Sequence, residues 1–133
     1  MIKIIVNGTF DIVHRGHIEM LNYAKSLGNQ LLVAIDTDRR VRELKGNSRP
    51  VNSEEDRRFL LLNLKSVDWV WTFDSDQDLI RIIDTYKPDI MVKGSDYKNK
   101  PIVGEHLIKE IKFYDRVEPY STTKTIQDIT DRR

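Results

Sequence analysis

Short apolar, β-branched segments alternate with segments of helical period along the whole chain, and this alternation constrains the fold more than any other feature. Residues 2–6 (IKIIV) and 31–35 (LLVAI) are almost unbroken apolar runs, and further strands are predicted over 67–73, 90–92 and 112–117. Strands of this kind are buried on both faces, which is typical of a parallel sheet with helical crossovers. The pattern predicts an α/β fold, a doubly wound, Rossmann-like parallel five-stranded sheet with helices on both faces.

Helices are expected between these strands, over residues 18–27, 53–64, 76–86, 105–111 and 122–130. Gly28 is a natural residue just past the first helix, Ser53 can cap the second, and Pro88 lies just past the third. The inward faces are expected to carry Ile18, Leu21, Ala24 and Leu27, then Leu60, Leu61 and Leu64, then Leu79, Ile80 and Ile83. Residues 36–52 are polar and basic, so a loop or in part a short helix is expected there.

The chain has 133 residues and no linker or repeat, so a single domain over residues 1–133 is expected. Lys and Arg total 22 against 21 Asp and Glu, whereas a nucleic-acid binder or polybasic membrane protein normally has a larger excess of cations. No apolar run is long enough to cross a bilayer, and no signal peptide is recognisable. Cysteine is absent, which is typical of a reducing compartment. We expect a cytoplasmic protein with no nucleic-acid or membrane partner.

The loop after the first strand, NGTFDIVHRGH over residues 7–17, is the first candidate site. Parallel α/β sheets bind ligands beyond the carboxyl ends of their strands. Gly8 allows a close approach of backbone to ligand, and the following helix offers N–H groups to an anion. His14 and His17 are three residues apart and can both face a phosphoryl group. Ordinary packing and a metal site are the alternatives, but no third ligand is evident, so no protein-held metal is predicted.

The combination of GTFD over 8–11 and HRGH over 14–17 resembles the signature of the nucleotidyltransferase superfamily with the H-x-G-H motif. This group includes glycerol-3-phosphate cytidylyltransferase and the adenylyltransferase domain of ADP-heptose synthase. The resemblance covers residues 2 to about 129. It implies that His14 and His17 stabilise the transferring α-phosphate and that no covalent intermediate forms. By the same motif, nucleotide-binding roles are assigned to Gly8, Thr9, Phe10 and Gly16, and a substrate-phosphate role to Asp11.

Residues 39–58 carry seven cations against four carboxylates. The ordinary interpretation is a solvated face, and the alternative is a clamp for phosphate groups. The segment 44–52 (LKGNSRPVN) resembles the matching region of the heptose adenylyltransferase, where a lysine and an arginine at the places of Lys45 and Arg57 contact phosphate. The resemblance therefore implies a catalytic and phosphate-binding Lys45 and a phosphate-binding Arg57.

Two later loops complete the predicted site. Residues 92–97 (VKGSDY) resemble the heptose adenylyltransferase, and Lys93, Gly94 and Asp96 are assigned to the nucleotide. Ser121, Thr122 and Thr123 can cap the last helix, and in the family such a triplet binds the β- and γ-phosphates. Before this triplet, residues 116–120 (RVEPY) lack the Arg-Thr-Glu-Gly run of the cytidylyltransferases, which favours ATP over CTP.

These observations predict a nucleotidyltransferase that transfers NMP, foremost AMP from ATP, to a phosphorylated sugar such as a heptose 1-phosphate and releases pyrophosphate. Mg²⁺ is the expected cofactor, because the triphosphate charge needs neutralising. The alternatives are a cytidylyltransferase that makes a CDP-polyol from CTP and glycerol 3-phosphate or a similar phosphate, and a nucleotide-binding module without catalysis. Trp69, Trp71 and Tyr114 are expected to pack rather than bind ligand, and the resemblance implies a homodimer.

Overall fold

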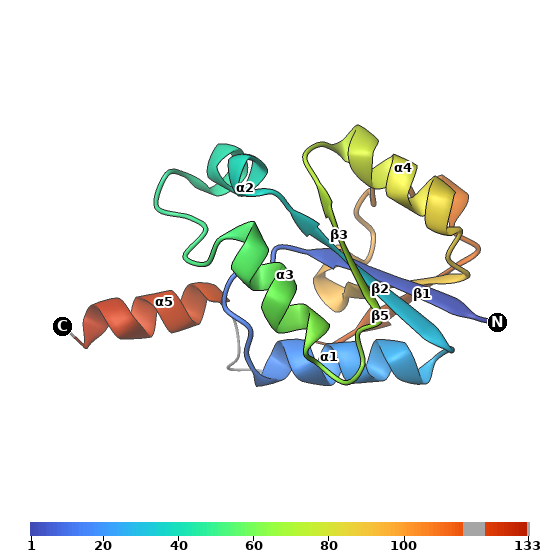
Figure 1. Cartoon of the computed structure of the whole chain (residues 1–133), viewed down its shortest axis with the longest axis horizontal. Coiled ribbons are helices and arrows are strands. Elements are labelled where there is room, and N and C mark those ends of the chain that lie inside the picture. The colour runs from blue at the N-terminus through green and yellow to red at the C-terminus, as the bar shows by residue number, and fades with distance from the viewer. Residues whose placement is uncertain (116–121, 133) are drawn as a thin grey trace.

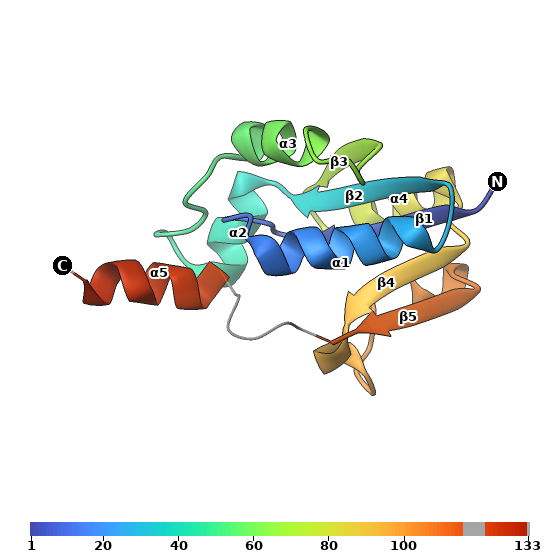
Figure 2. The ribbon, with the colours of Figure 1, turned by 90° about the horizontal axis from the view of Figure 1, so that it is seen from below.

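The computed structural model describes residues 1–115 and 122–132, and residues 116–121 and 133 lie outside this description. Its centre is one sheet of five strands: β1 (Lys3–Gly8), β2 (Gln30–Asp36), β3 (Trp69–Phe73), β4 (Ile90–Gly94) and β5 (Glu110–Tyr114). The strands lie in the order β3-β2-β1-β4-β5, and every neighbouring pair is parallel (Figure 1, Figure 2). The predicted doubly wound α/β fold is confirmed.

Helices cover both faces of this sheet (Figure 1, Figure 2). On one face lie α1 (Arg15–Ser26) and α3 (Glu54–Leu62), and on the other lies α4 (Asp76–Tyr86) with the segment 101–108. The remaining elements are α2 (Asp38–Lys45), the 3₁₀ turns η1 (Ser95–Tyr97) and η2 (Glu105–Leu107), and α5 (Thr122–Asp131). α5 projects away from the sheet in both views. No helix among the described residues has the length and apolar content to cross a bilayer.

Successive residues of β1 face opposite layers of the molecule. Ile4 and Val6 pack in the cluster under α1 and α3, whereas Ile5 packs in the cluster under α4. All three are almost completely buried, as is β2 from Leu31 to Ile35. Burial on both faces removes the polar alternation of an ordinary surface strand, which is why these strands appear as apolar runs in the sequence.

The helices differ from the prediction at particular positions. Residues 36–52 contain the short helix α2, as the prediction allows, and it begins where the Thr37 hydroxyl accepts the N–H of Arg40. Ile18 and Leu60, predicted to face inward, are 37% and 44% exposed. In α3 the inward position next to Leu60 is Leu61, and the two side chains lie about 100° apart around the helix.

The predicted helix over 105–111 is reduced to the single turn η2, because the chain from Glu110 onward pairs with β4. Pairing with a buried neighbour strand outweighs the helical spacing of the apolar residues in this segment. The last strand therefore begins at Glu110 rather than at 112. It ends at Tyr114, and the end of the predicted strand at 116–117 lies outside the described residues.

The strand order reverses between β1 and β4. The chain passes from β1 outward to β2 and β3 on one side, then returns to place β4 and β5 on the other side. The connections that leave the carboxyl ends of β1 and β4 therefore diverge and open a crevice between them. In sheets of this type such a crevice is where ligands bind.

Candidate active site

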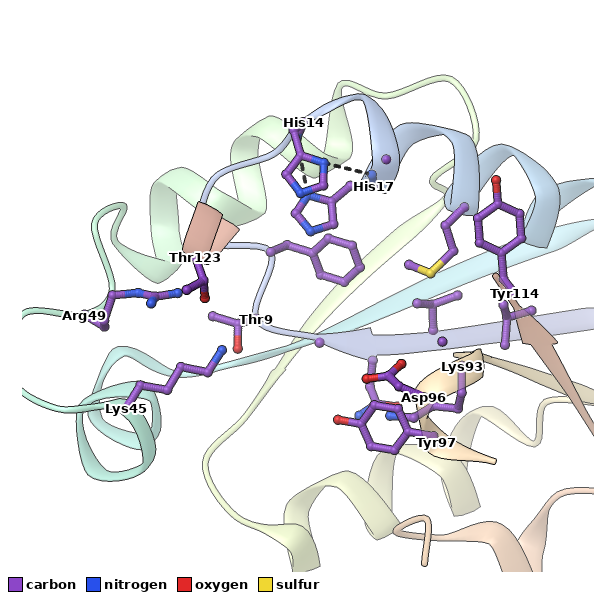
Figure 3. A pocket seen from close by; sticks show the side chains of 18 residues that line it. Thr9, His14, His17, Lys45, Arg49, Lys93, Asp96, Tyr97, Tyr114 and Thr123 are labelled. Carbon is purple, nitrogen blue, oxygen red and sulfur yellow. Dashed lines mark hydrogen bonds between the residues drawn. The ribbon is translucent and has the colours of Figure 1, made fainter. Parts of the chain in front are cut away.

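Two adjoining cavities open at this crevice. The first, here called the His cavity, has a volume of about 360 Å³ and includes His14 and Tyr114 in its lining (Figure 3). The second, here called the Asp36 cavity, has a volume of about 400 Å³ and includes Asp36 and Asp76. The residues that line both cavities form the shared wall: Asn7, Gly8, Thr9, Phe10, His17, Lys45, Arg49, Lys93 and Tyr97.

The shared wall begins with a tight turn at the end of β1. Phe10 has a positive φ of 51°, a left-handed conformation that is uncommon for a bulky side chain. Its ring is buried and lies against Gly8, where an added Cβ would come within 3.0 Å of the ring atom Cε2. A residue larger than glycine at position 8 would displace the ring. The turn therefore needs Gly8 and keeps the backbone of residues 8–10 next to both cavities.

His14 and His17 fix each other at the start of α1. Nδ1 of His14 accepts the backbone N–H of His17 at 3.4 Å, and Nδ1 of His17 accepts the backbone N–H of His14 at 3.3 Å. This is a reciprocal capping box. The two rings stack with centroids 3.8 Å apart (Figure 3). Because Nδ1 is an acceptor in each neutral ring, the ring proton is carried on Nε2.

Burial keeps His17 neutral at physiological pH. Desolvation lowers its pKa to about 4, His14 acts in the same direction, and the backbone of Ile12 opposes both. A neutral imidazole still has one N–H to donate. His17 borders both cavities, whereas the Nε2 atom of His14 is itself buried.

Asp11 is buried and holds the basic loop in place. Its carboxylate accepts the backbone N–H groups of Val51 and Asn52 at 2.9 Å and Nε of Arg49 at 3.1 Å. It is predicted to contact the substrate phosphate, and the structure places it in the lining of the Asp36 cavity with its oxygens bound to protein donors. A carboxylate repels phosphate, and the oxygens of Asp11 already bind protein donors. Asp11 borders the Asp36 cavity, and its effect there is to position Arg49.

Arg57 also differs from its predicted role at the substrate phosphate. Its side chain has no exposed surface and does not line either cavity. The guanidinium donates to the carbonyl oxygens of Asn52, Thr9 and Asp36 and to the carboxylate of Asp38, at 2.9–3.0 Å. These acceptors belong to three separate segments: the loop after β1, the junction of β2 and α2, and the loop before α3. Arg57 therefore joins the segments around the crevice from outside both cavities.

Lys45 and Arg49 bring positive charge to the shared wall. Lys45 is the last residue of α2, and Arg49 is the partner of Asp11. Loss of water around the ammonium, followed by the nearby Arg49, lowers the pKa of Lys45, while Asp36 and Asp11 oppose this. Two cations placed together disfavour each other, so an anion between them is stabilised.

Asp36 ends β2 and supplies a buried carboxylate to the second cavity. It is 8% exposed, accepts Nε of Arg40 at 3.2 Å and lies 3.5 Å from the Thr9 hydroxyl. Burial raises the pKa of Asp36, and Arg40 opposes that effect. Asp76 adds a second carboxylate, and Arg40, which also lines the cavity, donates to both carboxylates. Phe73, Leu79, Ile102 and Val103 supply an apolar part of the wall.

A family model described as cytidylyltransferase-like matches residues 5–129. The chain belongs to the cytidylyltransferase-like family. It is a nucleotidyltransferase, which confirms the family and the enzyme class predicted from the GTFD and HRGH motifs.

Among curated proteins, the bifunctional protein HldE of Campylobacter fetus is 48% identical over 126 residues, which cover 95% of this chain and 27% of that protein. HldE of Campylobacter jejuni is 48% identical over 130 residues, covering 98% of this chain and 28% of the relative. The chain thus spans about a quarter of the length of these relatives.

Two solved structures resemble this cytidylyltransferase-like chain. The lipopolysaccharide core biosynthesis protein from Thermoplasma volcanium has a TM-score of 0.71 at 29% identity, covering 88% of this chain and 99% of the other. Pantothenate synthetase from Thermus thermophilus has a TM-score of 0.60 at 13% identity, covering 96% of this chain and 64% of the other. The second similarity concerns the fold alone.

The structure brings together most of the predicted site residues of this family member. The following line the His cavity: Gly8, Thr9, Phe10, His14, Gly16, His17, Lys45, Lys93, Gly94, Asp96 and Thr123. Ser121 lies outside the described residues, and Thr122 is described only as the first residue of α5. Thr123 shows that the start of α5 reaches the cavity although the helix projects away from the sheet.

Several lining residues are missing from the sequence-based set. Asn7 and Tyr97 lie within the candidate segments 7–17 and 92–97, but no role is assigned to either from the sequence. Tyr114 was expected to pack, but it lines the His cavity while its ring lies 5.1 Å from that of Tyr23. Its place follows only from the sheet order, which puts the end of β5 beside β4. Trp71 packs against Tyr86 as expected.

Proposed function

We propose that this nucleotidyltransferase transfers AMP from ATP to a phosphorylated sugar, a sugar 1-phosphate of the heptose kind, and releases pyrophosphate. The observation that carries the proposal is the shared wall, where two cavities meet at His17, Lys45 and Arg49. Substrates in the two cavities bring their phosphate groups together at this positive charge. The choice of substrates is supported by the motifs that resemble the adenylyltransferase domain of ADP-heptose synthase and by the 48% identity to HldE of Campylobacter fetus.

The nucleotide is assigned to the His cavity. Met20 and Tyr114 offer an apolar and aromatic wall for a base. The N–H groups at the start of α1 and the hydroxyl of Thr123 suit phosphate oxygens. His17 donates to the α-phosphate, and His14 does so once nucleotide binding uncovers its Nε2 atom.

The phosphorylated sugar is assigned to the Asp36 cavity. Sugar hydroxyls are hydrogen-bond donors, and the carboxylates of Asp36 and Asp76 are acceptors. Phe73 and Leu79 suit the apolar C–H face of a sugar ring. The sugar phosphate then points to Lys45 and Arg49 on the shared wall.

The reaction is a direct displacement at the α-phosphorus. An oxygen of the sugar phosphate forms a bond to the α-phosphorus, and the bond from that phosphorus to the oxygen bridging to the β-phosphorus breaks. The electron pair leaves with pyrophosphate. The attacking oxygen is already ionised, so no general base is needed. The contribution of the chain is position and electrostatic stabilisation, as expected for phosphoryl transfer.

Mg²⁺ is proposed as part of the nucleotide substrate. Among the described residues, no group of three or more His, Asp or Glu side chains is placed to hold a metal ion. The donors on the shared wall are mostly cationic or neutral, and they fit phosphate better than a metal. When present, Mg²⁺ neutralises charge on the triphosphate.

The test is a pyrophosphate-release assay that combines ATP, CTP, GTP and UTP, each with Mg²⁺, with several sugar 1-phosphates and polyol phosphates. The proposal expects ATP with a heptose 1-phosphate to give the highest kcat/KM. His17→Asn should abolish the signal, and the exposed Arg42→Met should keep it. Pyrophosphate release only with CTP and a polyol phosphate would refute the proposed substrates and identify the enzyme as a cytidylyltransferase that makes a CDP-polyol. No release with any pair would leave a nucleotide-binding module without catalysis.

A further inference from the structure

Lys93 is the most deeply buried cation at the crevice. It lies in β4, on one side of the point where the strand order reverses, and its side chain is 8% exposed. Its ammonium donates a long hydrogen bond of 3.4 Å to Oδ1 of Asn7, which lies across the crevice in β1. Lys93 borders both cavities, and Figure 3 labels it among the residues that line the His cavity. An ion bound between β1 and β4 would therefore lie next to this ammonium.

The immediate surroundings of Lys93 leave room for an anion. The amide of Asn7 is neutral, and so is the Tyr97 ring, whose centroid lies 4.0 Å from Nζ. Burial lowers the pKa of Lys93, while Asp96 and Asp36 favour the charged form. A buried ammonium is unfavourable unless an opposite charge approaches it. A phosphate that enters from either cavity supplies that charge.

Of the lysine and arginine side chains on the shared wall, Lys93 is the one held inside the sheet. Lys45 is an exposed residue at the end of α2 although its ammonium is partly desolvated, and the guanidinium of Arg49 is held by the carboxylate of Asp11. Both suit the binding of a phosphate that arrives from solvent. Lys93 sits where solvent is excluded, and there a fixed charge stabilises developing negative charge most strongly.

We propose that Lys93 is a catalytic residue whose ammonium contacts the α-phosphoryl group while it passes between the two cavities. This inference rests on the proposed function and deepens it. The bond from the sugar-phosphate oxygen to the α-phosphorus forms as the bond to the pyrophosphate oxygen breaks, and Lys93 contacts the non-bridging oxygens most closely in the transition state. It transfers no proton. Lys93 stabilises the transition state more than the ground state, because the charge on the non-bridging oxygens is redistributed as the phosphorus changes partners.

The absence of cysteine makes a direct test of this charge practical. In Lys93→Cys the introduced thiol is the only one in the chain. Alkylation with 2-bromoethylamine then restores an ammonium at the position of the original one, whereas alkylation with iodoacetamide gives a neutral amide of nearly the same size. Lys98→Cys, treated identically, is the control, because Lys98 is exposed in the segment that follows β4 and lines neither cavity. Lys93→Met is the second neutral variant.

We expect the neutral forms, the amide and Lys93→Met, to lose about 10²–10³-fold in kcat, as for removal of one charge-stabilising donor. KM for both substrates should change by less than about threefold, and the aminoethyl form should regain at least about tenfold in kcat. All Lys98 forms should match the wild type. Thermal denaturation of each form establishes that it is folded.

A neutral form with normal kcat, or an aminoethyl form without recovery, would refute the role of Lys93 and leave the proposed function intact. A loss confined to KM would make Lys93 a binding residue only and also refute it. If the wild type releases no pyrophosphate with any substrate pair, the proposed function fails first and this inference fails with it.

Discussion

Replacement of Arg57 by methionine should destabilise the fold rather than weaken phosphate binding directly. The variant removes four hydrogen bonds, to the carbonyl oxygens of Asn52, Thr9 and Asp36 and to the carboxylate of Asp38. Breaking a buried charge network by removing one partner costs about 3–5 kcal/mol. That is a large share of the ~5–15 kcal/mol by which a domain of this size is usually stable.

Urea denaturation measures this loss. With an m-value of about 1–3 kcal/mol/M, a loss of ~4 kcal/mol lowers the midpoint by roughly 1.3–4 M. Arg57→Lys keeps the positive charge but not the forked donors. Its urea midpoint should therefore lie between those of the wild type and Arg57→Met. Arg42→Met, at an exposed position on α2, is the matched control and should leave the midpoint unchanged. A stable Arg57→Met with a raised KM for the phosphate substrates would show that the side chain binds ligand and that the structural argument is wrong.

Four further outcomes are expected. Because the pKa of His17 is about 4 in the folded protein, against 6.5 for an ordinary histidine, its neutral form favours folding above pH 6.5. That stability, about 3 kcal/mol at most, is lost as the pH falls from 6.5 to 4, so His17→Asn should show a weaker pH dependence in urea denaturation. Lys45→Ala should raise KM for both substrates in the pyrophosphate assay, and an unchanged KM would contradict its assignment. Asp36→Asn should raise KM for the sugar phosphate alone. A raised KM for ATP would show that the assignment of the sugar phosphate to the Asp36 cavity is wrong. If the chain forms the expected homodimer through the aromatic edge at β3, light scattering should give twice the chain mass, and Trp69→Glu should return the mass of one chain.

The parts of the fold that the sequence predicts are those fixed by neighbouring residues. The apolar runs of β1 and β2 and the spacing of His14 and His17 are local features, and both lead to the correct place in the structure. Leu60 shows the limit of such reasoning. It shares the helical spacing of the buried leucines, and only the orientation of α3 against the sheet decides that it is exposed.

The roles of Asp11 and Arg57 could not be predicted because they depend on distant backbone groups. Both are charged residues near a phosphate-binding motif, which favours a ligand contact when only the sequence is considered. Asp11 finds its partners about 40 residues away in the chain, and Arg57 binds the carbonyl oxygen of Thr9, 48 residues away. Such carbonyl and N–H groups carry no sequence signal, and burial makes their pairing obligatory.

The reciprocal capping of His14 and His17 affects how substitutions in this motif must be interpreted. Each ring holds the main chain of the other, so alanine at either position removes a helix cap together with a phosphate donor. Asparagine is a strong helix cap but cannot replace the imidazole at a phosphate. At position 14, the difference between the alanine and asparagine variants therefore measures the integrity of the first turn of α1, and the loss common to both measures chemistry. A survey that uses alanine alone would assign to catalysis an effect that belongs partly to the helix.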